Sequence, residues 1–487
     1  MTPSPLFRPA MSASPLRTLP AMLAVAAALA IGGCALPIAH PGAAFDIPAT
    51  WDEAAASEAA ASSIDAEWWR QFGSAELDAL VERALAGSPD LAVATERVLQ
   101  AEIAARSARA SLFPTVDLRL DTSTTGSRDS DGSSNSRGSQ ASLGISYEID
   151  VWGSNIARYE GSRYSLAATR YDYEATRLSL VAGVVNAYTQ ILSQRARLDI
   201  ARENLAIAER LFKIVEARYR NGAASALDLS RQRGTVLSQR DAILPLEVTE
   251  RQLLRALAIL VGSTPVGFDV AGRNLDPLAI PHVAPFVPAE LLVRRPDLAA
   301  AEAQLAAAAA NITVARAALF PLKLSLSASG GLSSGEFGLL NLSNPVSSGT
   351  LAISLLQSIF DGGRLRGAVE TSESQRRQIL ENYRKAVLTA LKEVDDAAAN
   401  AERSQQQEAS QLAIRTEYER ALRLSELRYR EGSDDLSSLL DAQRSLFSVQ
   451  DSIVQQRLSR LNAAVDLYKV LGGGWIVPPS PTDTTEG

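Results

Sequence analysis

The 487-residue sequence has almost none of the side chains that form disulfides or bind soft metals. It contains one cysteine, Cys34, and two histidines, His40 and His282, while its three methionines all precede Cys34. A single cysteine cannot form an intrachain disulfide, and two histidines cannot complete a conventional metal site. No catalytic group of residues and no Gly-rich phosphate loop stands out either. We therefore expect no metal, no cofactor and no enzymatic activity.

Positive charge and long apolar runs are also scarce. The formal net charge is −7, and the chain has no basic cluster, which argues against binding to nucleic acid. After the first 33 residues no stretch reaches the roughly 18 apolar residues of a membrane-spanning helix. If the mature chain crosses a membrane, it must therefore do so with strands.

Residues 1–33 have the organisation of an export signal. Arg8 and Arg17 form a weakly basic start, Met22–Ala30 is a short apolar run, and the sequence Ile-Gly-Gly-Cys ends at Cys34. This order is typical of a signal peptide rather than of a transmembrane helix.

The residues around Cys34 suggest lipidation. The sequence Ile-Gly-Gly-Cys resembles a bacterial lipobox, and the resemblance implies that the Cys34 thiol carries a diacylglycerol. Ala35 follows instead of Asp, which by the same resemblance favours sorting to the outer membrane. Residues 34–66 are rich in Ala, Pro and Ser and are expected to form a lipidated, extended tether. The alternative is a signal peptide with a chance cysteine.

The rest of the chain contains an internal duplication. Pro89–Pro114 aligns without a gap with Pro296–Pro321, and Arg218–Gly222 recurs as Arg428–Gly432. The two offsets, 207 and 210 residues, are nearly equal, so one order of elements is repeated: helix, strand, loop, strand, long helix, turn, helix. We expect a first repeat over 67–264, a second over 265–475, and a tail over 476–487.

Each copy of the sequence Leu-Phe-Pro is followed by segments of alternating polarity. In Thr115–Asp121, for example, Val116, Leu118 and Leu120 alternate with polar residues. This period of two, with one apolar face, is typical of transmembrane barrel strands, although a single such segment also suits a soluble sandwich. Four strands are predicted at about 114–122, 141–150, 321–330 and 349–358, with Ser- and Gly-rich surface loops at 122–140 and 331–348.

Four strands are too few for a closed barrel, since known membrane barrels begin at about eight. An open edge in lipid would cost several kcal/mol for each unpaired backbone group. The barrel must therefore be shared between subunits. Two subunits would give eight strands around an interior filled by side chains, whereas three would give twelve and leave room for a pore.

Long helices account for most of the remaining sequence. Ile156–Arg220 has no proline, and apolar residues recur every seven positions from Val184 to Tyr219, which indicates a coiled-coil seam. At 1.5 Å per residue this helix would be roughly 97 Å long. Arg364–Arg430 predicts a second helix of similar length. Each reverses at a glycine turn and returns as a shorter helix, giving hairpins over 156–262 and 364–471.

This order of elements resembles the TolC family of outer-membrane factors, and especially its lipidated multidrug-efflux branch, which works with RND pumps. The resemblance covers about residues 31–475. It is carried by Trp68–Phe72, Arg294–Leu298, Phe360–Arg364, Leu440–Leu446 and Leu467–Trp475.

The resemblance implies an α+β membrane protein that assembles as a homotrimer. Twelve shared strands would form a β-barrel in the outer membrane, and the helical hairpins would form a periplasmic α-barrel, with a mixed region from residues 67–88, 262–295 and 465–487. Its function would be a passive exit duct for drugs or other small molecules. An inner-membrane pump, of RND type, and a periplasmic adaptor would deliver them.

The two helical turns are the candidate adaptor contacts, because they are the ends farthest along the chain from the predicted strands and contain small residues. The candidate residues are Gly222, Ala223, Ala224, Ser225, Leu227, Gly432, Ser433, Asp434 and Leu436. The alternative is that they are only turns.

A gate on the helix after the second turn is a further implication of the resemblance. Asp441 and Arg444 would form it, and their spacing of three places them on one helical face. Ser437 stands where relatives can have a bulky apolar residue, so the closure would be more polar here. The alternative is a local surface ion pair.

Other functions remain open at this point. A periplasmic adaptor lipoprotein is the main rival, although adaptors have one helical hairpin and this sequence predicts two. A lipid-anchored enzyme lacks a candidate site. Among ducts of the same fold, a type I secretion duct or a metal-ion efflux duct are the alternatives.

Overall fold

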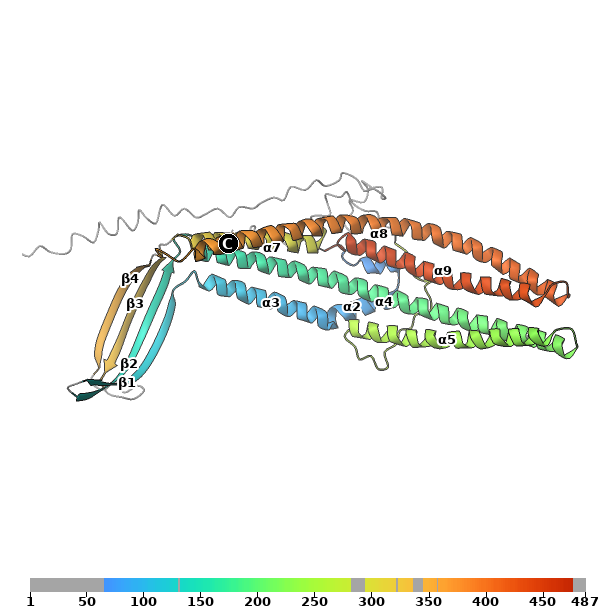
Figure 1. Ribbon diagram of the computed structural model, residues 1–487, viewed down its shortest axis with the longest axis horizontal. Coiled ribbons are helices and arrows are strands. Elements are labelled where there is room, and N and C mark those ends of the chain that lie inside the picture. Colours follow the sequence, from blue (N-terminus) through green and yellow to red (C-terminus); the bar gives the residue numbers. More distant parts are fainter. Residues whose placement is uncertain are drawn as a thin grey trace, which may run out of the picture. The chain divides into compact units, whose positions relative to one another are not determined.

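The computed structural model describes residues 65–129, 132–281, 294–320, 323–335, 345–356 and 358–475. The export signal, Cys34 and most of the tether lie outside the described residues, and so does the tail. In chain order the elements are η3 (Trp68–Phe72), α2 (Ala75–Gly87), α3 (Pro89–Ala110), β1 (Thr115–Asp129), β2 (Gly132–Ile149), α4 (Ser154–Arg220), α5 (Ala226–Leu260), α7 (Pro296–Ala317), β3 (Lys323–Ser334), β4 (Val346–Leu356), α8 (Arg364–Arg430) and α9 (Leu436–Val470) (Figure 1).

The duplicated order of elements is present. Helix, two strands, long helix and return helix occur twice, and α4 and α8 have 67 residues each, which makes each helix about 100 Å long. The chain divides into two compact units. One contains the four strands with the adjoining helix ends, over 103–163 and 306–377, and the other contains the remaining described residues.

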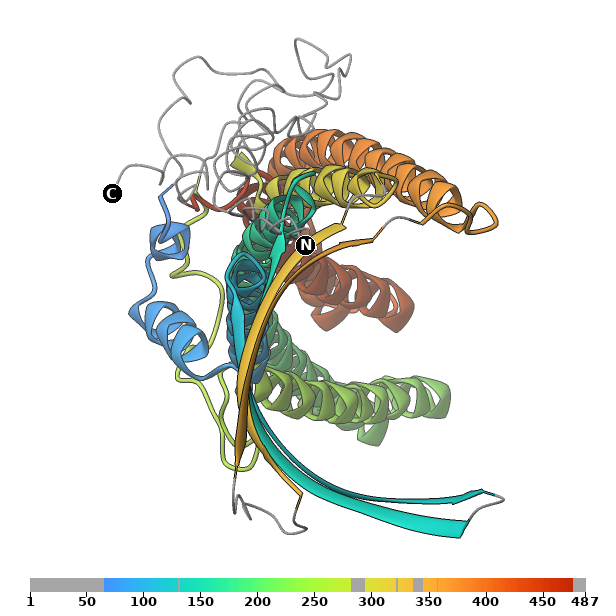
Figure 2. The same cartoon turned by 90° about the vertical axis from the view of Figure 1, so that its left-hand side faces the viewer.

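The strands form one antiparallel sheet in the order β1-β2-β3-β4, and Figure 2 shows that it is strongly curved. Its register places Val116 opposite Ile145 and Leu326 opposite Ile353, so apolar residues share one face, as their alternation predicts. These side chains are exposed in the single chain. β1 and β4 are the edges of the sheet.

The predicted surface loops are in large part strand, which corrects the sequence interpretation. β1 and β2 pair without interruption from Thr115–Ser146 to Asp129–Gly132, and β3 extends to Ser334 while β4 begins at Val346. A ladder of backbone hydrogen bonds does not depend on side-chain polarity. Where both faces become polar, the alternation that reveals a strand disappears although the strand continues.

Three apolar clusters hold the second unit together. The largest joins η3 and α2 to α4, α5 and α9, with Trp68 stacked on Tyr468 at 4.9 Å between ring centroids. A second joins α7, α8 and α9 around Leu298 and Val387. The third joins α4, α8 and α9 close to the turns, around Val215.

The heptad seam predicted for α4 is only partly correct. Val184, Ile191 and Leu198 are buried, but Tyr219 is exposed. Nearer the turn, burial passes to Ala208, Leu211 and Val215, of which Ala208 and Val215 belong to a second, smaller stripe of the same heptad pattern. An α-helix has 3.6 residues per turn, so a repeat of seven drifts around a straight helix and burial moves from one stripe to the other.

Helix α7 meets the length and hydropathy of a membrane span, contrary to the expectation that no later segment does. It is rich in alanine, which raises its mean hydropathy to 1.3, and 56% of its most apolar window is buried within the chain. A core helix has the same properties, so α7 alone is weak evidence for a span.

Candidate functional site

The two turns are built alike. In the first, Gly222 has φ +75°, a conformation that glycine adopts without strain. The amide of Gly222 donates to the carbonyl of Tyr219 at 3.0 Å, and that of Ala223 to Arg218 at 2.8 Å. Gly432 and Ser433 repeat both bonds at the second turn, to Tyr429 and Arg428. These bonds satisfy carbonyls left free at a helix end.

Side-chain caps fix the start of each return helix. Ser225 and Asp228 form a reciprocal capping box on α5, and hydrogen bonds from the Ser225 backbone and hydroxyl lower the pKa of Asp228. On α9, Asp435 accepts the amide of Ser438 at 3.0 Å, and this bond, with those of the Ser437 and Ser438 hydroxyls, lowers the pKa of Asp435. Each cap stabilises its helix by about 1 kcal/mol.

Exposure separates the candidate contact residues. Gly222, Ala223, Ser225, Gly432 and Ser433 are exposed, whereas Ala224 and Asp434 are half-buried. Leu227 is 59% exposed, but Leu436 is only 4% exposed because it packs in the apolar cluster of α4, α8 and α9. Leu436 therefore stabilises its own subunit, and we remove it from the predicted contact surface.

A contact between the two hairpins was missed in the sequence. The Arg218 guanidinium lies over the Tyr429 ring at 4.6 Å from its centroid, and Nη1 donates to the Tyr429 carbonyl. Within the second turn, Arg428 approaches Asp434 at 3.5 Å. No periodic signal marks the contact of Arg218 with Tyr429, because these two residues are 211 positions apart in the chain.

The proposed gate residues lie on the exposed side of α9. Arg444 Nη1 is 3.5 Å from Asp441 Oδ1, and the two side chains are 81% and 73% exposed. Ser437 does not join them, because its hydroxyl donates to Asp435 at 2.9 Å. Within one subunit these residues therefore form an exposed ion pair and a separate cap contact.

A groove of about 390 Å³ lies beside this pair, between α4, α5 and α9. Gln443 projects from α9 into it and is 1% exposed, yet neither of its amide atoms has a hydrogen-bond partner among the described residues. The lining also includes Arg197, Asn204, Gln239, Arg444 and Asp451.

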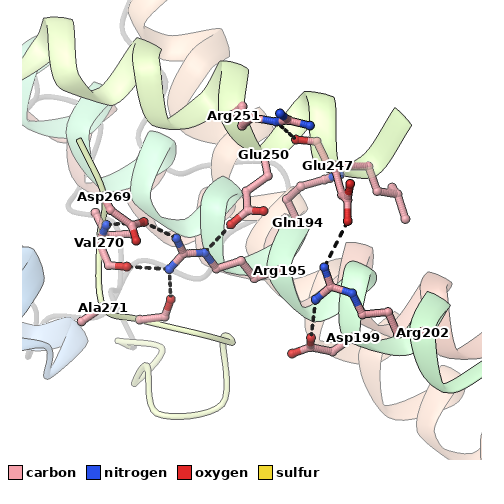
Figure 3. A network of polar contacts seen from close by, with 12 residues as sticks. Gln194, Arg195, Asp199, Arg202, Glu247, Glu250, Arg251, Asp269, Val270 and Ala271 are labelled. Carbon is pink, nitrogen blue, oxygen red and sulfur yellow. Dashed lines mark hydrogen bonds and ion pairs between the residues drawn. The ribbon is translucent and has the colours of Figure 1, made fainter. Parts of the chain in front are cut away.

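The segment between the repeats, residues 262–281, is held by an arginine from each hairpin, and we call it the strap. Figure 3 shows Arg195 of α4. It binds Glu250 of α5 at 2.7 Å, the strap carbonyls of Val270 and Gly272 at 2.6 Å each, and the carboxylate of Asp269.

The second strap arginine is Arg457 of α9. It donates to the strap carbonyls of Leu275 and Leu278 at 3.4 and 3.3 Å and to Glu408 of α8 at 3.1 Å. Arg460 donates to the other oxygen of Glu408 at 2.6 Å. Burial would raise the pKa of Glu408, but these two arginines outweigh it and lower the pKa.

Among the described residues, no three His, Cys, Asp or Glu side chains are grouped in a way that could hold a metal ion.

Comparison with known proteins gives consistent matches. The family model described as outer membrane efflux protein matches residues 80–263 and 287–473. The pyoverdine export outer membrane protein OpmQ of Pseudomonas aeruginosa is 40% identical, over 93% of this chain and 96% of its own. The antibiotic efflux pump outer membrane protein ArpC of Pseudomonas putida is 32% identical, over 92% and 94%.

A solved structure has the same fold. The open state of the Neisseria gonorrhoeae outer-membrane channel MtrE is similar with a TM-score of 0.76 and 26% identity. The match covers 90% of this chain and 98% of that chain.

Proposed function

This chain belongs to the outer membrane efflux protein family, and from that premise we propose that it works as a lipid-anchored homotrimer. The chain is the outer-membrane channel component of a tripartite efflux system. In our proposal, a periplasmic adaptor contacts its two turns, and an RND-type inner-membrane pump supplies the cargo.

The two free edges of the sheet are the observation that carries the proposal. Among the described residues, β1 and β4 each have a partner strand on one side only, and each of the four strands contributes exposed apolar residues to one face of the sheet. In lipid, free edges are costly and must be paired. Three copies would supply twelve strands, enough to surround a pore.

The trimer is tested in detergent. Light scattering, corrected for bound detergent, should give three chains per particle, because the apolar face and the open edges need lipid or detergent and partners. A stable monomer in plain buffer would contradict the shared barrel.

A second candidate cargo class comes from sequence identity. OpmQ, named for pyoverdine export, is 40% identical to this chain, whereas the antibiotic efflux protein ArpC is 32% identical. A strain without the gene separates the two cargo classes. Higher sensitivity to antibiotics would support drug efflux, and a lower siderophore level in the medium would support siderophore export. If the strain without the gene behaves like the wild type in both assays, and no second duct can replace this one, both cargo classes are contradicted.

A further inference from the structure

We propose that Arg128 and Arg137, on the β1–β2 hairpin, bind phosphate groups of the lipopolysaccharide around the channel. The inference rests on the proposed function, which inserts the sheet in the outer membrane. It goes beyond that function, because it assigns a lipid-binding site to the outside of the barrel.

The β1–β2 hairpin is longer than the rest of the sheet. β2 and β3 stop pairing at Ser139 and Ser334, whereas β1 and β2 continue to Asp129 and Gly132 (Figure 2). The pairing of β1 with β2 has no interruption over this length. Alternate residues of β1 therefore stay on the same face of the sheet as far as Arg128.

Both arginines lie on the face that carries the apolar side chains. Arg128 lies eight residues after the apolar Leu120 of β1, an even number, so the two side chains share a face. Arg137 of β2 is paired with Thr124, which is four residues after Leu120 and on the same face. Directly opposite residues of two strands point to one side. In a membrane barrel the apolar face is the one that meets lipid.

The arginines lie beyond the apolar rows, toward the outside of the cell. Thr122 and Ser139 are the first polar pair after these rows, with their hydroxyl oxygens 3.2 Å apart. The opposite ends of the two strands lead to α3 and α4, which belong to the periplasmic helices of the proposed duct. The hairpin turn therefore faces the outer leaflet, where lipopolysaccharide carries phosphate groups on its sugars.

Charge is divided between the two faces of the sheet. Asp121 and Glu148 belong to the opposite face, as does Arg119, which approaches Asp121 at 3.7 Å. On the apolar face of the described strands there is no Asp or Glu, and the only charged side chains are Arg128 and Arg137. Both are exposed, and neither guanidinium has a hydrogen bond or ion pair with another described residue.

Phosphate is the ligand that this surface fits. A guanidinium presents parallel N–H donors that match two phosphate oxygens, and cations beside a bilayer attract anionic headgroups. Four residues separate Arg128 from Thr124, the partner of Arg137, which is roughly 13 Å along the strand. This spacing suits the several phosphates of lipopolysaccharide, which are spread over neighbouring sugars, better than the single phosphate of a phospholipid.

Native mass spectrometry of the detergent-solubilised protein can count the lipid molecules that remain bound. Rough-type lipopolysaccharide is the probe, and the comparison lipids are the same lipopolysaccharide without its phosphates and phosphatidylglycerol. EDTA is present throughout, so that no divalent cation joins lipid phosphates to carboxylates. The wild type should retain the phosphorylated lipopolysaccharide several-fold better than either comparison lipid.

Substitutions locate the site. Arg128→Gln and Arg137→Gln should each lower the binding of lipopolysaccharide several-fold, and the double variant should lower it further, because each change removes one phosphate contact. Arg119→Gln is the matched control, since Arg119 is an exposed arginine of β1 on the opposite face, and it should bind like the wild type. The number of chains per particle and the melting temperature without added lipid should be the same in all variants.

Each contrary outcome overturns a different statement. Equal binding of lipopolysaccharide by the wild type and the double variant would show that the two arginines hold no phosphate. An equal loss in Arg119→Gln would show that binding follows total charge rather than this face. Equal or tighter binding of phosphatidylglycerol would overturn the choice of lipopolysaccharide. A wild type that forms no trimer in detergent would instead contradict the proposed function.

Discussion

At the scale of residues, burial decides which side chains of the turns are free to contact another protein. Leu227 and Leu436 each lie shortly after a glycine turn, but they are one position out of step, since the residue that corresponds to Leu227 in the second turn is Ser437. The structure exposes the first and buries the second. Sequence reasoning could locate the turns from their glycines, but not this difference, because it depends on which face of α9 packs on α4 and α8.

Bulky side chains at the turns should block adaptor docking. Ala224→Trp or Ser433→Trp should lower antibiotic resistance several-fold at an unchanged trimer level, because close packing of tips needs small residues. Ala206→Trp, at an exposed position on α4 outside the turn, is the control. If resistance survives both turn variants, the adaptor binds elsewhere.

Removing the exposed pair on α9 should open the channel. Asp441→Ala with Arg444→Ala should raise single-channel conductance in planar bilayers and sensitise cells to vancomycin, because the proposed gate is closed by these groups around the trimer axis. The control is Glu381→Ala with Arg384→Ala, an exposed pair of the same spacing on α8. Equal conductance of the two double variants would remove Asp441 and Arg444 from the gate.

At the scale of elements, the helices could be predicted closely and the strands could not. The bounds of α8 match the sequence prediction, because proline, glycine and long polar-apolar periodicity mark helix ends clearly. β1 and β2 are longer than predicted, since Thr122–Asp129 carries no apolar alternation. The strap contacts were also invisible, because Arg195 and Arg457 bind backbone carbonyls, which have no sequence signature.

The ion pairs of Glu408 should stabilise the fold in a pH-dependent way. Its pKa is lowered in the folded state, so its stabilisation is present above the unfolded value of about 4.3 and is lost as pH falls through the folded pKa. Glu408→Gln should cost about 1–3 kcal/mol at pH 7.

The melting temperature of the detergent-solubilised protein, followed by circular dichroism, measures this effect. The difference between wild type and Glu408→Gln should be constant near neutral pH and should shrink in acid below the unfolded pKa. Glu419→Gln, which removes the charge from an exposed pair on the same helix, should change little at any pH. A difference that does not depend on pH would assign the loss to packing instead.

At the scale of the whole molecule, the strands and the lipid should anchor the protein independently. Several acyl chains or a barrel hold a protein firmly, whereas a single chain holds it weakly. Cys34→Ser should therefore abolish metabolic labelling with palmitate but leave most of the protein in the outer-membrane fraction. Recovery of the variant entirely from the soluble periplasmic fraction would show that the strands do not insert.

The duplication has a consequence for how such a ring could have originated and how it assembles. Because the order of elements occurs twice in the chain, a half-length ancestor with two strands could have closed the same ring as a hexamer. In such a hexamer, six contacts form between separate chains. Fusing two copies turns three of these into contacts within one chain, where the two partners meet at a high effective concentration. It also frees the two tips to diverge, and they have: Ala223 and Ala224 in one correspond to Ser433 and Asp434 in the other.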